Sequence, residues 1–128
     1  MKVKTAKLVR PALDWAVVEA QGLKAVFPHG QLFLDHGKGN WSWYEPSTAW
    51  GHGGPIIERE GIGLEQMRLG DGWHATIGCT LHDFLMWDEP YDLDAYYAEG
   101  PTPLVAAMRC FVASELGGEV DIPEELLT

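Results

Sequence analysis

The chain has only two cysteines, no long apolar run and few basic residues in its second half. Cys79 and Cys110 form no C-x-x-C pair, which excludes a zinc ribbon or a thioredoxin-like motif. We expect two buried thiols in a reducing cytosol, with a single disulfide as the alternative. No segment approaches the roughly 20 apolar residues of a membrane span, and residues 1–5 lack the apolar core of a signal peptide. These absences predict a cytoplasmic protein that does not enter membranes.

Basic residues are scarce after position 59. Residues 1–59 carry seven Lys/Arg and five Asp/Glu, a net charge of +2. Residues 60–128 carry two Lys/Arg and fourteen Asp/Glu, a net charge of −12. An acidic surface repels phosphate backbones, so direct nucleic-acid binding is not expected. A solvated acidic face is the simplest interpretation, and a basic partner or mimicry of a nucleic acid is the alternative.

The length and composition are those of one ordinary globular domain. Apolar residues make up 46% of the 128 residues, enough for a core without disulfides or metal. Two helices are predicted, one from Pro11 to a stop at Gly22 and one from Pro103, after Thr102, to Gly117. The sequence predicts a single α+β domain over residues 1–128. In it, two main helices pack on a small, mostly antiparallel sheet.

Short apolar and aromatic runs between turn residues predict the strands. Residues 23–27 and 31–34 flank Pro28-His29-Gly30, which indicates a β-hairpin. Residues 41–44 are aromatic and predict a third strand, and residues 73–79 alternate in polarity and predict a fourth.

Other segments carry weaker signals. Little periodicity is present between Glu45 and Pro55, where glycines and prolines argue against a regular element. Residues 88–99 are acidic and bear tyrosines, and we expect a loop there with at most one helical turn. Asp14 is placed on the polar side of the first helix.

The central segment from Tyr44 to Glu60 combines aromatic, glycine, hydroxyl-bearing and charged residues. Glycines let the backbone approach a ligand closely, and tryptophan offers a flat face for stacking. The structural alternative is that the tryptophans fill the core and the glycines serve tight turns. We predict a surface that binds a small polar or nucleotide-like ligand or a host protein. The predicted residues are Tyr44, Ser47, Thr48, Trp50, His52, Gly53, Gly54, Glu58, Arg59, Glu60 and Arg109.

Two carboxylates flank Arg59 in this segment. On a strand Glu58 and Glu60 would share one face, and with His52 they would supply the acid–base groups of a small hydrolase or transferase. Ordinary surface charge is the competing interpretation, and the two residues then do no chemistry.

Arg109 lies in an otherwise apolar stretch of the last predicted helix. A lone arginine on a mostly buried helix needs an anionic partner. An internal carboxylate, such as Glu58, Glu60 or Asp14, is favoured over the anion of a ligand.

No metal or cofactor motif is present. Gly51-x-Gly53-Gly54 lacks the strand and helix of a dinucleotide fingerprint and the Gly-Lys-Ser/Thr of a Walker loop. The histidines form no H-E-x-x-H pair. His74, His82 and Asp83 would supply three metal ligands only if the fold brought them together. We predict neither a metal nor a cofactor.

Four segments resemble the NinX-type family of phage and prophage proteins. They are Leu13-Asp14-Trp15-Ala16-Val17; Pro46-Ser47-Thr48 with Trp50; Gly53-Gly54-Pro55-Ile56-Ile57-Glu58-Arg59-Glu60-Gly61; and Gly100-Pro101-Thr102-Pro103-Leu104 with Ala106-Ala107-Met108-Arg109. The resemblance implies a phage or prophage accessory protein that acts in the cytoplasm of a bacterial host. It implies no substrate.

The chain departs from the family pattern beside Trp50. The family usually has Asp at the position of Ala49 and Ala-Gln at Gly51-His52. If that Asp were catalytic, its absence would argue against catalysis here. The favoured hypothesis is therefore a non-catalytic binding module, monomeric or homodimeric, with the small hydrolase and an acidic interaction or structural protein as alternatives.

Overall fold

The structure, a computed structural model, describes residues 1–68, 70–79 and 95–127. Within these ranges it contains three α-helices and three small antiparallel sheets, which confirms the predicted α+β class. The helices are α1 (Ala12–Ala20), α2 (Trp50–Glu60) and α4 (Pro103–Leu116), with 3-10 turns η1 (Thr5–Lys7), η2 (Pro28–Gly30) and η3 (Glu124–Leu126). The strands are β1 (Lys2–Lys4), β2 (Ala25–Val26), β3 (Phe33–Asp35), β4 (Trp41–Trp43), β5 (Gly63–Gln66), β6 (Trp73–Ile77), β7 (Tyr96–Gly100) and β8 (Glu119–Asp121).

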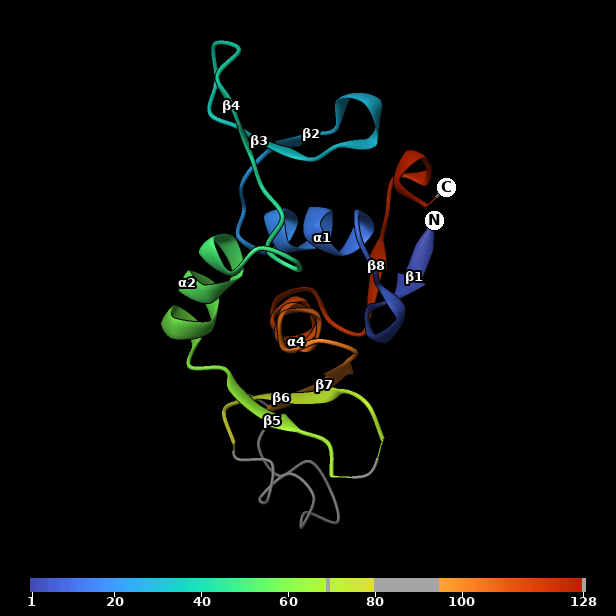
Figure 1. Cartoon of the computed structure of the whole chain (residues 1–128). Coiled ribbons are helices and arrows are strands. Elements are labelled where there is room, and N and C mark those ends of the chain that lie inside the picture. Colours follow the sequence, from blue (N-terminus) through green and yellow to red (C-terminus); the bar gives the residue numbers. More distant parts are fainter. Residues whose placement is uncertain (69, 80–94, 128) are drawn as a thin grey trace.

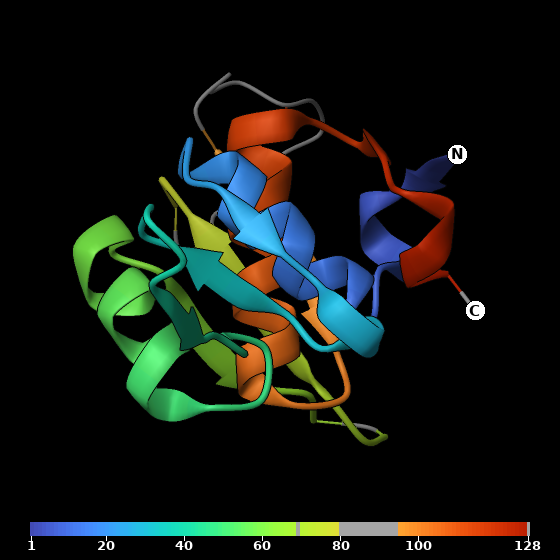
Figure 2. The same ribbon diagram turned by 90° about the horizontal axis from the view of Figure 1, so that it is seen from above.

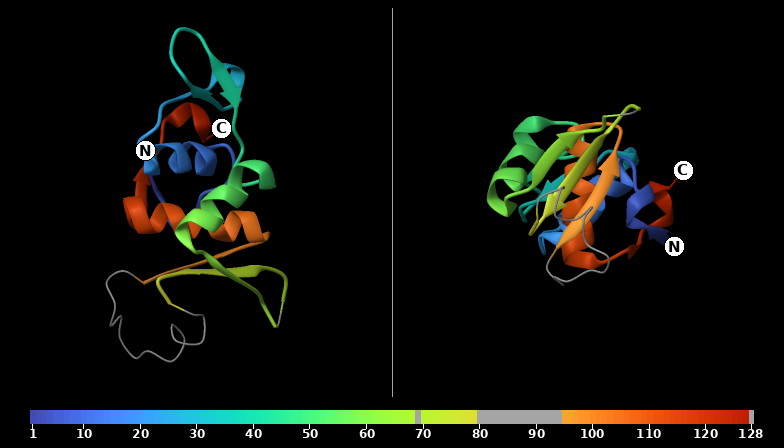
Figure 3. Two further views of the ribbon diagram at one scale, coloured as in Figure 1. Left: turned by 90° about the vertical axis from the view of Figure 1, so that its left-hand side faces the viewer. Right: turned by 90° about the horizontal axis from the view of Figure 1, so that it is seen from below.

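Helix α4 runs through the middle of the molecule (Figure 1). One side of it packs on the β5-β6-β7 sheet and the other on α1, with the β2-β3-β4 sheet beyond α1 (Figure 3, left). Helix α2 flanks this stack, and the β1-β8 pair lies at the opposite side (Figure 2). The strands are thus divided among three sheets instead of gathered in the single sheet that the sequence predicted.

The first helix and the hairpin follow their local signals. Pro11 immediately precedes α1, and Gly22 has a φ of +70° just beyond its end, where a left-handed residue terminates a helix. Strand β2 pairs antiparallel with β3 across η2, and β4 adds the third strand with Phe33 opposite Trp43. Trp41 lies in the predicted strand but is 51% exposed, so it is no core residue.

Helix α4 begins where the sequence predicted. The Thr102 hydroxyl accepts a 3.1 Å hydrogen bond from the backbone N–H of Val105, as an N-cap does. Gly117 follows the last helical residue, as predicted. Half of the α4 residues are buried, because the helix is covered on both sides.

Helix α2 corrects the prediction of an irregular segment before Pro55. Its glycines and proline weaken helix propensity, but tertiary contacts outweigh that cost. Ile56 is fully buried and Gly53 packs tightly inside the fold. Gly61 ends the helix in the left-handed conformation, with its N–H and that of Ile62 both donating to the Ile57 carbonyl.

Strand β7 corrects the loop predicted up to residue 99. It pairs antiparallel with β6, placing Tyr97 opposite Thr76 and Ala98 opposite Ala75. The first part of the predicted acidic loop, residues 88–94, lies outside the described residues.

Asp14 is the main correction within the core. It was placed on the polar side of α1, but only 1% of it is exposed. Cys110 is buried, as expected, whereas Cys79 is only partly buried. None of the helices in the described ranges is long and apolar enough to cross a membrane.

Candidate functional site

A hydrogen bond joins two of the family-like segments. The backbone N–H of Ser47 donates to Oδ1 of Asp14 at 2.8 Å, although the two residues are 33 positions apart. Both residues are buried. This bond fixes the turn of residues 45–49 on α1, directly before α2 begins.

Gly53 brings the third and fourth segments into the same place. A Cβ atom on Gly53 would lie 2.3 Å from the carbonyl oxygen of Pro46 and 2.6 Å from Cδ2 of Leu104. No side chain fits in that space, because real contacts of a Cβ are longer than 3.0 Å. The turn, α2 and the start of α4 therefore form one tightly packed junction.

An open cleft lies at this junction, with a volume of about 380 Å³. Trp50 stands at its edge and is 56% exposed. Apolar groups from the first turn of α4 form the opposite wall. We call it the Trp50 cleft; it is lined by Ser47, Thr48, Trp50, Thr102, Pro103, Leu104 and Val105. Three of the predicted ligand-binding residues thus lie together, facing α4 residues that the prediction omitted.

His52 lies behind the cleft instead of lining it. Its Nδ1 accepts a 2.9 Å hydrogen bond from the backbone N–H of Glu45, so Nδ1 carries no proton. Its ring packs against Trp43 edge-on, with centroids 4.7 Å apart, and against Tyr44 at 5.2 Å. His52 therefore connects β4 to α2, and Tyr44 is buried beneath it.

The predicted acid–base grouping does not assemble in the described part of the chain. No hydrogen bond there joins His52 to a carboxylate. Glu58 and Glu60 are helical rather than extended, so they lie about 200° apart around α2. Glu60 accepts from Nε of Arg59 at 2.8 Å, and Glu58 is exposed. The hydrolase hypothesis lacks the geometry that it required.

Arg59 belongs to a separate polar network on the far side of α2. Its guanidinium donates to Oε1 of Gln21 at 3.4 Å and lies 5.8 Å from the centre of the Phe111 ring. Gln21 donates in turn to the hydroxyl of Tyr44 at 2.9 Å. Burial raises the pKa of Tyr44, which keeps this hydroxyl protonated. Arg59 and Glu60 thus line a different depression from the one beside Trp50.

Arg109 is satisfied by backbone carbonyls. Its Nε donates to the carbonyl of Leu8 at 2.9 Å and its Nη1 to that of Glu99 at 3.0 Å. The predicted pairing with Glu58, Glu60 or Asp14 is therefore wrong, because neutral oxygens take the place of a carboxylate. Arg109 lines a groove beside β7 and no part of the Trp50 cleft.

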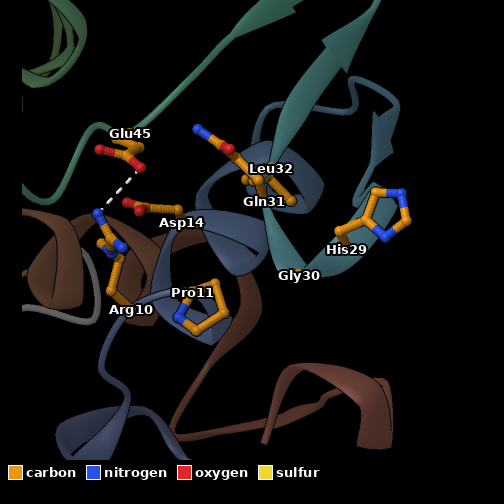
Figure 4. A pocket seen from close by; sticks show the side chains of 8 residues that line it. All are labelled: Arg10, Pro11, Asp14, His29, Gly30, Gln31, Leu32 and Glu45. Carbon is orange, nitrogen blue, oxygen red and sulfur yellow. Dashed lines mark ion pairs between the residues drawn. The ribbon is translucent and has the colours of Figure 1, made fainter.

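A second pocket, which the sequence did not indicate, lies between the start of α1, η2 and Glu45 (Figure 4). It has a volume of about 220 Å³. At one end, Nη1 of Arg10 forms a 2.9 Å ion pair with Oε1 of Glu45, close to the carboxyl of Asp14. We call it the Asp14 pocket; it is lined by Arg10, Pro11, Asp14, His29, Gly30, Gln31, Leu32 and Glu45.

Burial raises the pKa of Asp14 to about 6, since the charged form loses its hydration. The Ser47 hydroxyl and amide and the positive charge of Arg10 oppose this rise, and the negative charge of Glu45 adds to it. The Ser47 hydroxyl lies near enough to the Asp14 carboxyl to act on its charge, but neither this hydroxyl nor Oδ2 of Asp14 makes a well-formed hydrogen bond among the described residues. Periodicity gave no signal for this site, because burial of Asp14 depends on residues far away in sequence.

The described residues contain no group of three or more His, Cys, Asp or Glu side chains arranged to hold a metal. His74 contacts the hydroxyl of Tyr97 across the sheet. His82 and Asp83, the other two residues of the three-ligand site drawn from the sequence, lie outside the described residues.

The fold and the junction define a small α+β protein in which four sequence segments meet around the start of α2. The family model for Bacteriophage P22, NinX matches residues 4–115, a range that includes all four segments. The chain belongs to this phage family, and its membership supports a phage accessory protein. A search of curated proteins finds no match to the chain.

Proposed function

We propose that the protein is a non-catalytic binding module that holds a protein partner, from the phage or its host, at the Trp50 cleft. The observation that carries the proposal is the exposure of three tryptophans on neighbouring elements. Trp41 and Trp43 on β4 and Trp50 on α2 are 51%, 47% and 56% exposed. Tryptophan is usually largely buried, so this exposure calls for an explanation.

Exposed tryptophans suit a protein partner better than a small polar ligand. Tryptophan is among the commonest hot-spot residues of protein interfaces. Trp43 contacts His52, so the exposed tryptophans of β4 lie beside the same helix that carries Trp50. In contrast, the polar groups predicted to hold a small ligand are dispersed: Arg59 and Arg109 line other depressions.

The cleft also has the chemistry of a socket for an apolar side chain. Pro103, Leu104 and Val105 form its wall, and Thr48 and Thr102 bring hydroxyl groups to its rim. A partner that inserts an apolar side chain into the cleft would also cover the Trp50 indole with the surface of the partner. Burial of a large apolar side chain contributes about 1.5–3 kcal/mol.

Site-specific photocrosslinking in phage-infected bacteria tests the proposal. A photoreactive phenylalanine analogue at position 50 should yield one crosslinked product of defined mass. The matched control places it at Leu116, which is 38% exposed at the end of α4 and distant from the cleft in sequence and structure. Equal products at both positions, or none at position 50, would overturn the proposal.

The identified partner then permits a quantitative test. Trp50→Ala should weaken its binding by about 30-fold, the effect of a hot-spot side chain worth about 2 kcal/mol. Leu116→Ala should leave the affinity within about twofold of the original. Native mass spectrometry of freshly purified protein separates the competing case, since a bound small molecule appears there as an added mass.

A further inference from the structure

Asp14 carries an unmet hydrogen-bonding requirement at a pocket that the Trp50 proposal does not use. The side chain is 1% exposed, and only one carboxyl oxygen has a partner, the amide of Ser47. The other oxygen is buried without one among the described residues. Such a group destabilises the fold, more so when it is charged, and native proteins rarely leave it unsatisfied. The nearby Ser47 hydroxyl is also buried without a partner and makes no well-formed hydrogen bond to Oδ2, so this oxygen still lacks a donor.

The charges around Asp14 indicate which kind of donor fits. Arg10 already forms an ion pair with Glu45, and His29 is the other titratable group that lines the pocket. With Asp14 ionised, two carboxylates face one guanidinium, which leaves a net negative charge. A cationic donor would neutralise this charge, whereas a neutral donor would leave it.

The dimensions and walls restrict the donor further. About 220 Å³ is below the usual range for sites of drug-sized ligands, so the pocket accommodates a head group. Pro11, which is partly exposed, offers apolar surface for a methylene chain behind such a group. Gln31 is exposed and Arg10 is 51% exposed, so both side chains can swing aside to admit it.

We propose that the Asp14 pocket binds a primary ammonium or guanidinium group, which donates to Asp14 with the Glu45 carboxylate as a second acceptor. The group belongs either to a small free amine or to a lysine or arginine side chain of a protein. The proposal is independent of the Trp50 cleft, which is lined by other residues.

An NMR titration of the full chain with n-butylammonium chloride and with ethylguanidinium chloride tests the proposal. Both should shift the amide signals of Ser47 and Gln31 in a saturable way, while butan-1-ol, which is neutral, should not. Asp14→Asn should weaken binding at least about tenfold, because it removes the charge and keeps the acceptor for Ser47. Glu19→Gln, on the exposed face of the same helix, removes an equal charge and should change nothing.

The carboxyl carbon of Asp14 gives a readout that needs no variant. Its signal should move on addition of the amines at constant pH and ionic strength. Absence of movement, an equal response to butan-1-ol, or unchanged affinity in Asp14→Asn would each overturn the proposal. If a fixed water bridges Asp14 and Ser47, or if the two side chains form a direct hydrogen bond, the signal of the Asp14 carboxyl carbon should not move on addition of the amines.

Two further ligands distinguish the sources of the cationic group. Spermidine represents a free polyamine, and N-acetyl-lysine methylamide represents a lysine side chain within a protein. The ligand that binds more tightly identifies the source. If neither ligand binds, the proposal is contradicted. Because none of these probes contacts Trp50, failure here leaves the photocrosslinking result intact, and the reverse also holds.

Discussion

Gly53 and Pro46 are so close that a single added methyl group would lie 2.3 Å from the Pro46 carbonyl oxygen. Leu104 closes the same space from the side of α4. The contact determines where the first turn of α2 stands relative to the 45–49 turn and α4. Both walls of the Trp50 cleft therefore depend on it.

Gly53→Ala should lower the free energy of unfolding by about 2–3 kcal/mol, because overpacking of this kind forces backbone shifts. Gly54→Ala is the matched control: no atom lies within 4 Å of its added Cβ, so it should stabilise α2 by up to about 1 kcal/mol. Urea denaturation followed by tryptophan fluorescence measures both. Similar effects of the two variants would contradict the close contact.

Ala49→Asp should stabilise the protein by about 1 kcal/mol. Ala49 is the N-cap of α2, with extended backbone angles and no side-chain acceptor, so an aspartate there can accept from the N–H of Gly51 or His52. An aspartate at this position would then act as a helix cap. Ala49→Val, which supplies no acceptor, should give no gain in thermal midpoint.

The stability of the protein should depend on the protonation of Asp14. Its pKa is about 6 in the folded state against an ordinary value of 3.8, so the folded state holds this proton more tightly. The contribution of Asp14 is therefore most favourable below about pH 4 and falls by about 3 kcal/mol as the pH rises to about 6 and beyond. Asp14→Asn removes this dependence.

The measurement is the difference in unfolding free energy between Asp14→Asn and the original protein, from pH 4 to pH 8. The free energy of unfolding of Asp14→Asn should increase relative to that of the original protein as the pH rises. The exposed Glu19→Gln change should give a nearly constant difference. A flat difference for Asp14→Asn as well would show that the buried carboxyl titrates normally.

Arg109→Lys should destabilise the fold by about 1–2 kcal/mol. Arginine reaches two carbonyls, at Leu8 and Glu99, with a rigid planar group, and lysine cannot reproduce that geometry. Arg68→Lys, at an exposed position, should stay within about 0.5 kcal/mol of the original in thermal unfolding. An Arg109→Lys variant with unchanged stability would return Arg109 to the group of ligand-binding candidates.

The elements that could be predicted from sequence are those with local signals. The cap at Thr102, the stop at Gly22 and the turn at Pro28–Gly30 act within a few residues, so α1, α4 and the hairpin follow from them. Helix α2 could not be predicted, because its glycines oppose a helix and only the packing of Gly53 and Ile56 supports it.

The candidate site was predictable only in part. The segment around Trp50 attracted attention by composition, and it does line a cleft. Its partners from α4, Thr102 to Val105, gave no such signal because their sequence is that of a helix start. The Asp14 pocket depends on contacts between residues more than thirty positions apart, such as Asp14 with Ser47, and spacing carries no information about them.

The central position of α4 has a consequence for the order of events during synthesis. Strands β5, β6 and β7, helix α1 and helix α2 all contact α4, yet all precede it in the chain. On the ribosome these elements emerge before the surface that covers their apolar faces exists. The domain therefore completes its core only after residues 103–116 have left the exit tunnel, and until then its nascent chain is the form most exposed to proteases and chaperones.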